Sequence, residues 1–579
     1  MSKINIKIDG IDLQVDEGTR IIDAAKILNI DIPHLCYHPD QRIKALCRIC
    51  SVEVAGSKKM SAACSTYVWD GMEINTNTKR VHDAQKGILE MIMANHDQNC
   101  LICPRNGNCE LQTLCQRFGL KEQTLVKTID DCYKDDNPCI ERNAAKCVKC
   151  GRCDKICRDV QGVAALTWAS RSEKFAFTTA YNKPLLESDC VLCGQCTTVC
   201  PVGAIVEKDD TQRVWEALQD PTKHVIVQVA PAVRVALGDN FNLANGSVVT
   251  GKMTTALKRL GFDKVFDTVF AADVTIMEEG YELLQRIQQN GTLPMITSCS
   301  PGWVNYMEKH YGDQVDHLST AKSPQQIFGA LAKSYYADKA GIDKKDIISV
   351  SVMPCVAKKF EAARPEMGQD GVADVDIVIT TRELGKMIKY AGLDFNSLEE
   401  SQFDSPLGEG TGAGVIFGTT GGVMEAALRT VYEVVTKNNL EHIEFTEVRG
   451  WQGIKEATID LAGKPINIAI VHGLANAQKI MEEIKAGKSK YQFIEIMACP
   501  GGCIGGGGQP LGTTLAMKNL RMDALYEIDD TKPIRKSHEN AEVKKLYAEF
   551  LGEPLSDKAH HLLHTHYHKH EKNYNFSNL

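Results

Sequence analysis

Residues 495–510 read EIMACPGGCIGGGGQP, in which Cys499 and Cys503 are separated by three residues and surrounded by glycines. Glycine has no side chain, so the backbone beside these cysteines can approach a buried inorganic centre closely. Two cysteines at this spacing are a weak signal alone, and a glycine run is more often a flexible loop. Two further cysteine segments, at 297–303 and 353–361, strengthen the interpretation as one shared site.

These two segments read TSCSPGW and MPCVAKKFE, and they contribute Cys299 and Cys355. Each of the three segments follows an apolar run, which is typical of a buried parallel strand. These runs lie at 294–297, 349–353 and 493–497. Ligand sites in α/β folds favour the carboxyl ends of parallel strands. The cysteines are therefore expected to meet in one site between two lobes.

The rest of this region supports an α/β fold. Its apolar runs lie at 225–230, 264–270, 347–352, 376–380, 466–471 and 493–498. Helical patterns separate them at 251–260, 278–289 and 382–391. Alternating strands and helices predict parallel sheets. We expect a catalytic region of two parallel-sheet lobes at 210–515, preceded by ferredoxin-like α+β iron–sulfur domains.

Composition limits the function further. The chain has 579 residues, enough for about four domains of roughly 150 residues. Its net charge of -8 does not suggest a nucleic-acid partner. The first residues, MSKINIKIDG, contain no apolar signal region, and no run approaches the ~18 apolar residues of a membrane span. We therefore expect a cytoplasmic protein without a membrane span.

The chain contains 22 cysteines, many in CxxC pairs. Without an export signal, this pattern favours metal ligation in a reducing compartment over disulfides. Zinc is the competing metal, because CxxC pairs also build zinc sites. The spacings described next favour iron–sulfur clusters.

Residues 1–79 are expected to form the first cluster domain. Alternating apolar residues at 4–15 around Asp9-Gly10 predict a β-hairpin, and a helix is expected at 19–28. Four thiolates then follow that can hold a [2Fe-2S] cluster: Cys36, Cys47, Cys50 and Cys64. The arrangement resembles a plant-type ferredoxin domain. Two disulfides or a zinc site are the alternatives.

Residues 80–125 are expected to bind a second cluster. A helix predicted at 80–96 leads into a histidine and three cysteines at HxxxCxxCxxxxxC spacing, namely His96, Cys100, Cys103 and Cys109. This spacing resembles the His-ligated [4Fe-4S] motif of complex I and of large hydrogenases. A neutral imidazole in place of a thiolate changes the charge of the cluster and hence its potential. Cys115, Cys132 and Cys139 fit no motif and are expected to be free thiols.

Residues 126–209 carry the most specific spacing. Two runs of four cysteines follow the pattern of two-cluster bacterial ferredoxins, in which the fourth cysteine of each run ligates the other cluster. One [4Fe-4S] cluster is therefore assigned to Cys147, Cys150, Cys153 and Cys200. The other is assigned to Cys157, Cys190, Cys193 and Cys196. Arg158 stands where a proline is usual.

Together, the three catalytic segments resemble the signature of the [FeFe]-hydrogenases, and the resemblance extends from the first cysteine to Pro510. It implies an H-cluster, a [4Fe-4S] cubane joined through a cysteine to a two-iron unit that carries CO, cyanide and a dithiolate. It also implies the reversible reaction 2H⁺ + 2e⁻ ⇌ H₂. Residues 516–579 are expected to form a C-terminal helical extension similar to a hydrogenase small subunit.

The resemblance assigns Cys355, Cys499 and Cys503 as cubane ligands, with Cys503 as the bridging thiolate. The family usually has TSCCPGW, in which the first cysteine relays protons and the second is a ligand. Here Cys299 stands in the first place and Ser300 in the second. Either Ser300 binds as an alkoxide or Cys299 becomes the ligand, although thiolate is the preferred soft ligand. We expect Cys299 to remain beside the dithiolate amine.

Further roles follow from the same resemblance. The family's proton path corresponds to Glu279, Glu282 and Ser319, with Arg286 at its outer end, and the spacing of the two glutamates places them on one helical face. Lys358 is expected to donate to a cyanide ligand. The residues expected to line the two-iron unit are Pro231, Gln325, Met353 and Met497. Without the family, a solvated helix face and ordinary core packing would explain these residues.

Two forms of the enzyme differ in their partners. One works alone with ferredoxin, and the other is the catalytic subunit of an electron-bifurcating complex with a flavin- and NAD-binding subunit and a small iron–sulfur subunit. Residues 105–112, RNGNCELQ, resemble the alpha chains of complex I and of multisubunit hydrogenases, which favours the complex. A hydrogen sensor or a non-turnover electron-transfer subunit is the alternative function, because of Ser300.

Two segments have no role in this interpretation. Glycines at 408–414 and 418–422 match no phosphate-binding loop and are interpreted as packing or turn glycines. Six histidines crowd residues 560–570. They could bind a metal, but a solvated helical tail, or one that docks on the lobes, is the favoured interpretation.

Overall fold

The computed structural model describes residues 2–120, 135–171, 175–440, 443–461 and 463–569. Its N-terminal sheet has the order β2-β1-β5-β3-β4. The strands are β1 (Lys3–Ile8), β2 (Ile11–Asp16), β3 (Ser51–Val54), β4 (Ser61–Ala62) and β5 (Glu73–Asn75), and α1 (Ile21–Ile27) follows the hairpin. As predicted, β1 and β2 pair antiparallel around Asp9-Gly10. Both turn residues have positive φ, as a type I′ turn requires.

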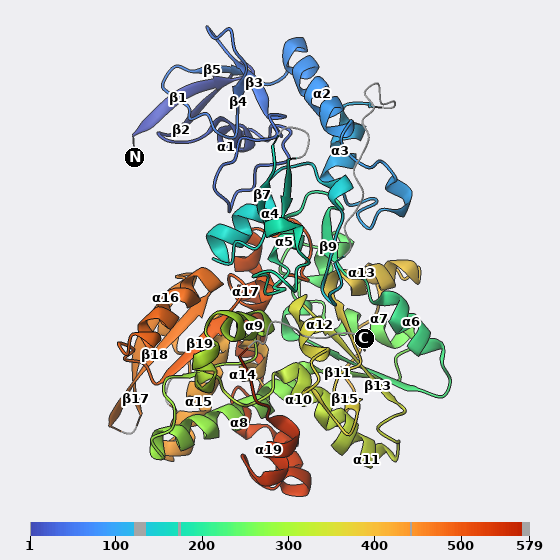
Figure 1. Ribbon diagram of the computed structural model, residues 1–579, viewed down its shortest axis with the longest axis vertical. Coiled ribbons are helices and arrows are strands. Elements are labelled where there is room, and N and C mark those ends of the chain that lie inside the picture. Colours follow the sequence, from blue (N-terminus) through green and yellow to red (C-terminus); the bar gives the residue numbers. More distant parts are fainter. Residues whose placement is uncertain (1, 121–134, 172–174, 441–442, 462, 570–579) are drawn as a thin grey trace.

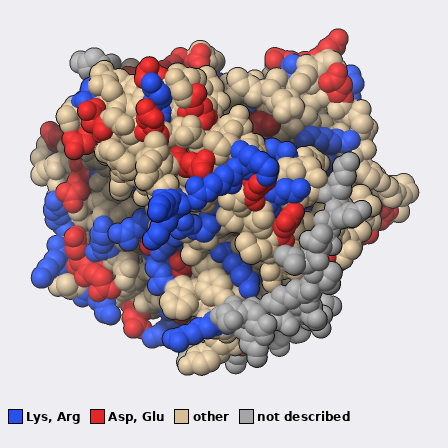
Figure 2. Space-filling view, turned by 90° about the horizontal axis from the view of Figure 1, so that it is seen from above, with Lys and Arg blue, Asp and Glu red and all other residues tan. Residues whose placement is uncertain are grey.

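The cluster domains follow as a column between this sheet and the catalytic lobes (Figure 1). Helices α2 (Lys79–Met93) and α3 (Glu110–Arg117) flank the second predicted cluster segment. Strand β6 (Ile140–Arg142) pairs antiparallel with β9 (Ile205–Glu207), which closes the two-cluster domain around the short helices α4 (Arg152–Lys155) and α5 (Gln195–Val199). Seen from the N-terminal end, Lys and Arg form a band across one face of the molecule (Figure 2).

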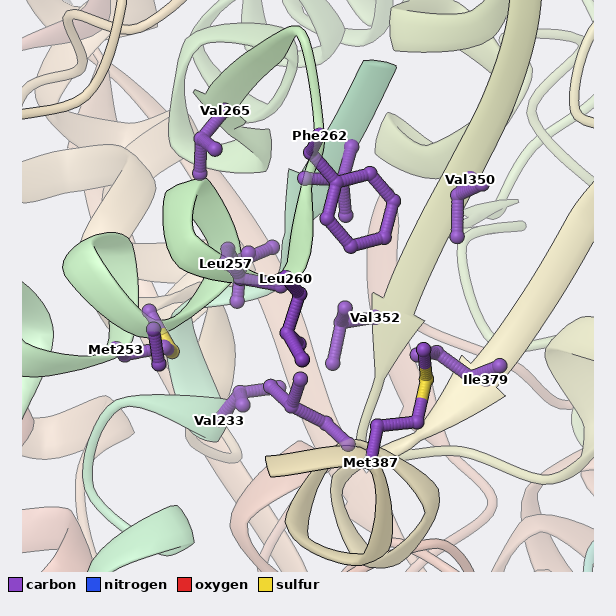
Figure 3. Packing of buried hydrophobic residues seen from close by; sticks show 14 of the residues in the cluster. Val233, Met253, Leu257, Leu260, Phe262, Val265, Val350, Val352, Ile379 and Met387 are labelled. Carbon is purple, nitrogen blue, oxygen red and sulfur yellow. The ribbon is translucent and has the colours of Figure 1, made fainter. Parts of the chain in front are cut away.

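The first catalytic lobe contains a wholly parallel sheet of order β11-β10-β13-β16. Its strands are β10 (His224–Val229), β11 (Lys264–Asp267), β13 (Ile347–Met353) and β16 (Ile377–Thr380). Helices α7 (Thr250–Leu260) and α13 (Thr381–Tyr390) pack their apolar faces on it. Figure 3 shows this core, in which Leu257 and Met387 from the two helices point toward Val352 of the central strand β13.

The second lobe contains a sheet of order β12-β19-β18-β17. The strands are β12 (Met295–Ile296), β17 (Ile454–Leu461), β18 (Lys464–His472) and β19 (Phe493–Met497). The first three in this order are parallel, as predicted, whereas β17 pairs antiparallel with β18. An antiparallel edge strand on an otherwise parallel sheet is common in α/β folds.

One sequence prediction is wrong. The apolar run at 264–270 was expected to be a strand, but β11 ends at Asp267 and α8 (Thr268–Gln288) begins there. The Asp267 side chain accepts a hydrogen bond from the backbone N–H of Val269 (3.1 Å), which caps the helix. Residues 268–276 are buried on every side and are mostly apolar, so the start of the helix gives no amphipathic signal.

The C-terminal extension docks on the lobes, as one of the interpretations of the sequence held. Its helices are α17 (Leu515–Thr531), α18 (Ala541–Leu546) and α19 (Asp557–Leu563). Arg521 of α17 is buried and pairs with Asp239 at 2.6 Å. Figure 1 shows α19 beside α8 and α10 (Pro324–Leu331). Among the described residues, no helix is long and apolar enough to cross a membrane.

Candidate active site

Three loops after the carboxyl ends of β12, β13 and β19 meet in a cavity of about 80 Å³ between the lobes. The cavity receives all four cysteines of the three motifs, together with Ser300. It also receives every other residue that the sequence assigned to the lining, namely Pro231, Gln325, Met353, Met497 and Lys358. The strand-end argument from the sequence therefore agrees with the position of the cysteines, and the family resemblance agrees with that of the other lining residues.

Glycines bring the backbone close to this cavity. A Cβ at Gly506 would lie 2.1 Å from the carbonyl oxygen of Pro354, the residue before Cys355. Gly502, before Cys503, has a φ of +86° and lies against the backbone of Thr419 and Thr420. Both positions therefore require glycine, and the glycine run is a packed wall of the cavity rather than a flexible loop.

The donor set fits an iron–sulfur centre. Burial raises the pKa of the Cys499 thiol, and the nearby Cys355 and Cys503 raise it further, so the three sulfur atoms lie close to one another. Charged thiolates cannot remain buried together without a cation to compensate them. Thiolates are the ligands that iron–sulfur clusters prefer. The three cysteines and the mostly apolar lining therefore suit such a centre.

Cys299 and Ser300 face different neighbours. Cys299 packs against the cluster of apolar side chains that includes Met497 and Phe417. Burial raises the pKa of its thiol, and the charge of Glu279 raises it further. The Ser300 hydroxyl instead accepts a hydrogen bond from the backbone N–H of Ala498 (3.2 Å), which precedes Cys499. Cys299 thus lies toward the glutamates and Ser300 toward the Cys499 loop.

Lys358 supplies the positive charge in the cavity. Its Nζ donates to the Cys299 carbonyl (3.1 Å), the Ser323 hydroxyl (2.7 Å) and both oxygens of Glu361 (2.9 and 3.0 Å). An ammonium group has three N–H donors, which these four acceptors already share. Lys358 can donate to a bound ligand only if one of these bonds is released.

Glu279 lies in helix α8 with both carboxylate oxygens buried, and neither has a hydrogen-bond partner among the described residues. Burial raises the pKa of Glu279 to about 8, and the neighbouring charge of Glu282 contributes to the shift. An unpartnered buried carboxyl is costly, so it indicates a functional constraint. A pKa near neutrality suits a group that both takes up and releases protons.

Glu282, one helical turn further, is firmly held. Its carboxylate accepts from the Ser319 hydroxyl (2.8 Å), from the Thr320 backbone N–H (3.1 Å) and from Arg286 Nη2 (2.7 Å). Arg286 also donates to the carbonyl of Leu318 (2.7 Å). The structure therefore brings Cys299, Glu279, Ser319, Glu282 and Arg286 together, with Arg286 on the side away from the cavity.

The accessory cysteines also assemble as predicted. One cavity is lined by Cys147, Cys150, Cys153 and Cys200, and a second by Cys157, Cys190, Cys193 and Cys196. These are the two crossed sets that the spacing implied. Burial raises the pKa of thiols in both sets, as expected where metal-free sulfurs are packed together.

The four cysteines of the first domain converge in the same way, and two cysteines of the His96 set lie within electrostatic range of each other. Hydrogen bonding to Cys47 and Cys64 lowers the pKa of Cys36, and hydrogen bonding to Cys64 lowers the pKa of Cys50, so these four thiols are in contact. Nδ1 of His96 is buried and lacks a hydrogen-bond partner among the described residues. The charge of Cys103 raises the pKa of Cys109, although burial is the larger cause.

Three cysteines were expected to be free. Cys139 is a free buried thiol whose Sγ donates to the Val356 carbonyl (3.3 Å). Cys115 is also free, and burial raises the pKa of its thiol to about 11. Cys132 lies outside the described residues.

Hydrogen bonds between the cysteine-bearing loops show which cysteine sets are neighbours along the molecule. Gln41 donates to the Arg152 carbonyl (3.2 Å), which joins the first domain to the Cys147 set. Arg105 donates to the Cys200 carbonyl (2.8 Å), which joins the His96 segment to the same set. The Cys190 set adjoins the active site, because Gln195 donates to the Gly505 carbonyl (2.8 Å).

Sequence reasoning missed several residues of the cavity. Thr268 and Ala272 line it from the start of α8, in and just after the run predicted as a strand. Phe417 lines it from the segment between the two glycine groups. A glycine-rich segment signals close packing, but it does not indicate which neighbouring side chain reaches a site.

Comparisons with known proteins agree with this architecture. The model of the iron only hydrogenase large subunit, C-terminal domain, matches residues 223–507, and that of the iron hydrogenase small subunit matches 516–570. The 2Fe-2S iron-sulfur cluster binding domain matches 1–79, the NADH-ubiquinone oxidoreductase-G iron-sulfur binding region matches 85–124, and the 4Fe-4S dicluster domain matches 146–204.

Two relatives are similar over almost the whole chain. The NADP-reducing hydrogenase subunit HndD of Solidesulfovibrio fructosivorans is 48% identical over 99% of this chain and 100% of its own. Iron hydrogenase 1 of Clostridium pasteurianum is 43% identical over 97% of this chain and 100% of its own. A solved structure of the [FeFe]-hydrogenase HydA(deltaEFG) is 45% identical, with a TM-score of 0.56 over 62% of this chain and 99% of that one. This chain therefore belongs to the [FeFe]-hydrogenases, oxidoreductases that act on H₂.

Proposed function

We propose that this hydrogenase interconverts protons and H₂ at an H-cluster held by Cys355, Cys499 and Cys503, with Cys503 as the bridging thiolate. When bound, such a centre supplies the two-electron chemistry that joins two protons into H₂. The observation that carries the proposal is the position of Glu279, an unpartnered buried carboxyl between Cys299 and Glu282. A subunit that only conducts electrons has no need of such a group.

The chain's own residues would move the proton in short steps. Cys299 exchanges it with Glu279, and Ser319 links Glu279 to Glu282, to which its hydroxyl donates at 2.8 Å. Arg286 holds Glu282 in place but does not carry the proton, because a guanidinium stays protonated. Lys358, whose charge is balanced by Glu361, would donate to a cyanide ligand after one of its present hydrogen bonds is released. Ser300, on the side of Cys499, is the candidate for the fourth cubane contact.

Electrons would reach the site through one [2Fe-2S] and three accessory [4Fe-4S] clusters. The Cys147 set contacts both the first domain and the His96 segment, so two entry routes converge there. The Cys190 set then adjoins the glycine loop of the active site. This arrangement supports delivery of electrons from two different partners.

We assign these partners as ferredoxin and a flavin- and NAD-binding subunit, with a small iron–sulfur subunit, in a cytoplasmic electron-bifurcating complex. The name of the relative HndD, an NADP-reducing hydrogenase subunit, supports a multisubunit setting. The band of Lys and Arg at the N-terminal end suits an acidic electron carrier (Figure 2). A flavoprotein that co-purifies with the chain would support the complex, and a chain isolated alone in active form would favour a ferredoxin-linked enzyme.

The first test is H₂ evolution from reduced viologen by the anaerobically purified, fully matured chain, beside the Ser300→Cys variant. We expect activity in the unmodified chain, because Cys299 keeps its place beside Glu279. The variant adds a thiolate at the Cys499 side, so the electron paramagnetic resonance spectrum of the cubane should change while the activity persists.

An inactive chain whose variant is active would contradict the proposal and favour a hydrogen sensor or an electron-transfer subunit. Infrared bands from CO and cyanide distinguish these two, since a sensor retains the two-iron unit and an electron-transfer subunit lacks it. The Ser300→Ala variant is the control, because it removes the hydroxyl without adding a ligand.

A further inference from the structure

At the outer end of the proposed proton route, neither Glu282 nor Arg286 is well placed to exchange protons with water. The Glu282 side chain is only 7% exposed, and Arg286 and the Ser319–Thr320 segment enclose it. Arg286 cannot serve, because its guanidinium does not release a proton at neutral pH. Protons must therefore reach Glu282 by way of another ionisable group.

The histidine-rich segment, defined here as residues 560–566, lies against this point. Residues 563–565 run antiparallel to 320–322, with hydrogen bonds from Lys322 N to the Leu563 carbonyl (2.7 Å) and from Thr565 N to the Thr320 carbonyl (2.8 Å). Thr320 is the residue whose backbone N–H binds Glu282. The segment thus covers the outer side of the proposed route, and Figure 1 shows α19, from which it continues, beside α8.

His564 is fixed on both of its ring nitrogens. Its Nε2 faces the Glu278 carboxylate at 3.0 Å, and its Nδ1 faces the Thr320 hydroxyl at 2.8 Å. Both side chains of the His564–Glu278 pair are buried, and the Tyr547 hydroxyl and the Leu555 N–H also donate to Glu278. A buried residue this well held acts as a positioning residue for its neighbours.

His560 is one of three exposed histidines of the segment, with His561 and His566. Its ring stacks on that of His564, with centroids 4.8 Å apart and planes 5° from parallel, and the His566 ring lies 6.3 Å away. Burial lowers the pKa of His560, and the charges of His564 and His566 lower it further. Glu282 and Glu278 oppose these effects on the pKa, so both carboxylates lie within electrostatic range.

The segment 320–322, which pairs with residues 563–565, also brings Lys322, whose ammonium is buried and paired with Asp374 at 2.8 Å. Helix α8 contributes Glu278, Glu282 and Arg286, and the turn after α18 contributes Tyr547. Helix α10 carries no titratable side chain. The net effect lowers the pKa of His560, so the exposed ring is a neutral imidazole at rest and carries a proton only in transit.

We propose that His560 is the solvent-side proton-exchange group of this hydrogenase and that His564 positions it for Glu282. The inference rests on the proton route proposed above. During H₂ evolution, hydronium gives a proton to His560, which becomes imidazolium. The imidazolium returns that proton to the Glu282 carboxylate through a water molecule, so the ring becomes neutral and Glu282 becomes a carboxylic acid. H₂ oxidation runs the same steps in reverse.

The test compares His560→Gln with His561→Gln in the full, matured chain. His561 is an exposed neighbour on the same helix, and only its backbone carbonyl is bonded, to Gln369 (2.7 Å). In dilute buffer we expect His560→Gln to lower the H₂ evolution rate about tenfold. Loss of a buried general acid costs ~10²-fold, but buffer molecules can partly replace a proton-exchange group at the surface. Added imidazole should restore the rate, and His561→Gln should match the unmodified chain.

A second measurement does not depend on H₂ turnover. A photoacid lowers the pH of the full chain in a flash, and time-resolved infrared follows the carboxyl band that Glu282→Gln removes. His560→Gln should slow the rise of this band about tenfold, again at the low end of proton-transfer effects. The inference is overturned if His560→Gln behaves like His561→Gln, if imidazole restores nothing, or if His317→Gln, near Arg286, causes the loss instead. An unmodified chain that evolves no H₂ overturns the proposed reaction, while the infrared result still decides the role of His560.

Discussion

At the scale of single residues, the site depends on groups that are costly to bury. Glu279 has no hydrogen-bond partner among the described residues, and Lys358 must share its donors among four acceptors. A fold selected for stability alone would replace such a carboxyl by an apolar side chain. Their presence around the four motif cysteines points to a functional constraint rather than to stability.

Glu279→Gln should remove proton transfer while the fold persists. We expect H₂ evolution to fall by about 10²-fold or more, because the amide cannot accept the proton. The infrared bands of the two-iron unit should remain. A variant with normal activity would exclude Glu279 from the route.

The same substitution should alter stability in a pH-dependent way. Because burial raises the pKa of Glu279 to about 8, the folded chain binds this proton more tightly than the unfolded chain does. The contribution of Glu279 to stability is therefore complete below its unfolded pKa of about 4.5 and is lost as the pH rises through about 8. As the pH rises across this window, the melting temperature of Glu279→Gln should increase relative to that of the unmodified chain. A constant difference would contradict the raised pKa.

At the scale of elements, strand ends followed by glycines form the cavity. The loops that follow β13 and β19 lie side by side. Gly506 lets the loop after β19 contact the Pro354 carbonyl in the loop after β13. Gly506→Ala should push these loops apart, cost about 1–3 kcal/mol of stability and lower the iron content of the purified chain. Iron analysis and melting temperature measure both effects.

Gly512→Ala is the matched control for this element. Its φ of +74° makes alanine strained, but nothing lies within 4 Å of the added Cβ. It should cost about 1–2 kcal/mol of stability and leave the iron content unchanged. Equal iron loss in both variants would mean that backbone strain, not close approach, explains the effect of Gly506→Ala.

Some elements of the structure could be predicted from the sequence and others could not. Parallel strands, the hairpin at 4–15 and the grouping of the eight cysteines of the two-cluster domain followed from periodicity and spacing, because these are local signals. The start of α8 did not, since residues 268–276 are buried on all sides and carry no helical period. The bond between Glu278 and His564 joins residues 286 positions apart, which no local pattern can reveal.

At the scale of the molecule, the contacts place the Cys190 set between the active site and all other clusters. Cys157→Ala should therefore abolish H₂ evolution with reduced ferredoxin. Removal of a ligand of an outer cluster, as in Cys36→Ala or Cys103→Ala, should leave the other entry route in use. Electron paramagnetic resonance must show the loss of a single cluster in each variant. Ferredoxin-linked activity in Cys157→Ala would disprove the single connection.

The contacts of helix α5 with the glycine loop have a consequence for engineering. Gln195 and Thr197 donate to the carbonyls of Gly505 and Gly507, and Arg382 of the first lobe donates to Gly507 as well. The two-cluster domain therefore holds, from its outer side, the glycine loop that lines the catalytic cavity. A minimal enzyme made by removing this domain would need other contacts to hold the glycine loop. A different electron-transfer domain fused in its place would have to reproduce the contacts of Gln195 and Thr197.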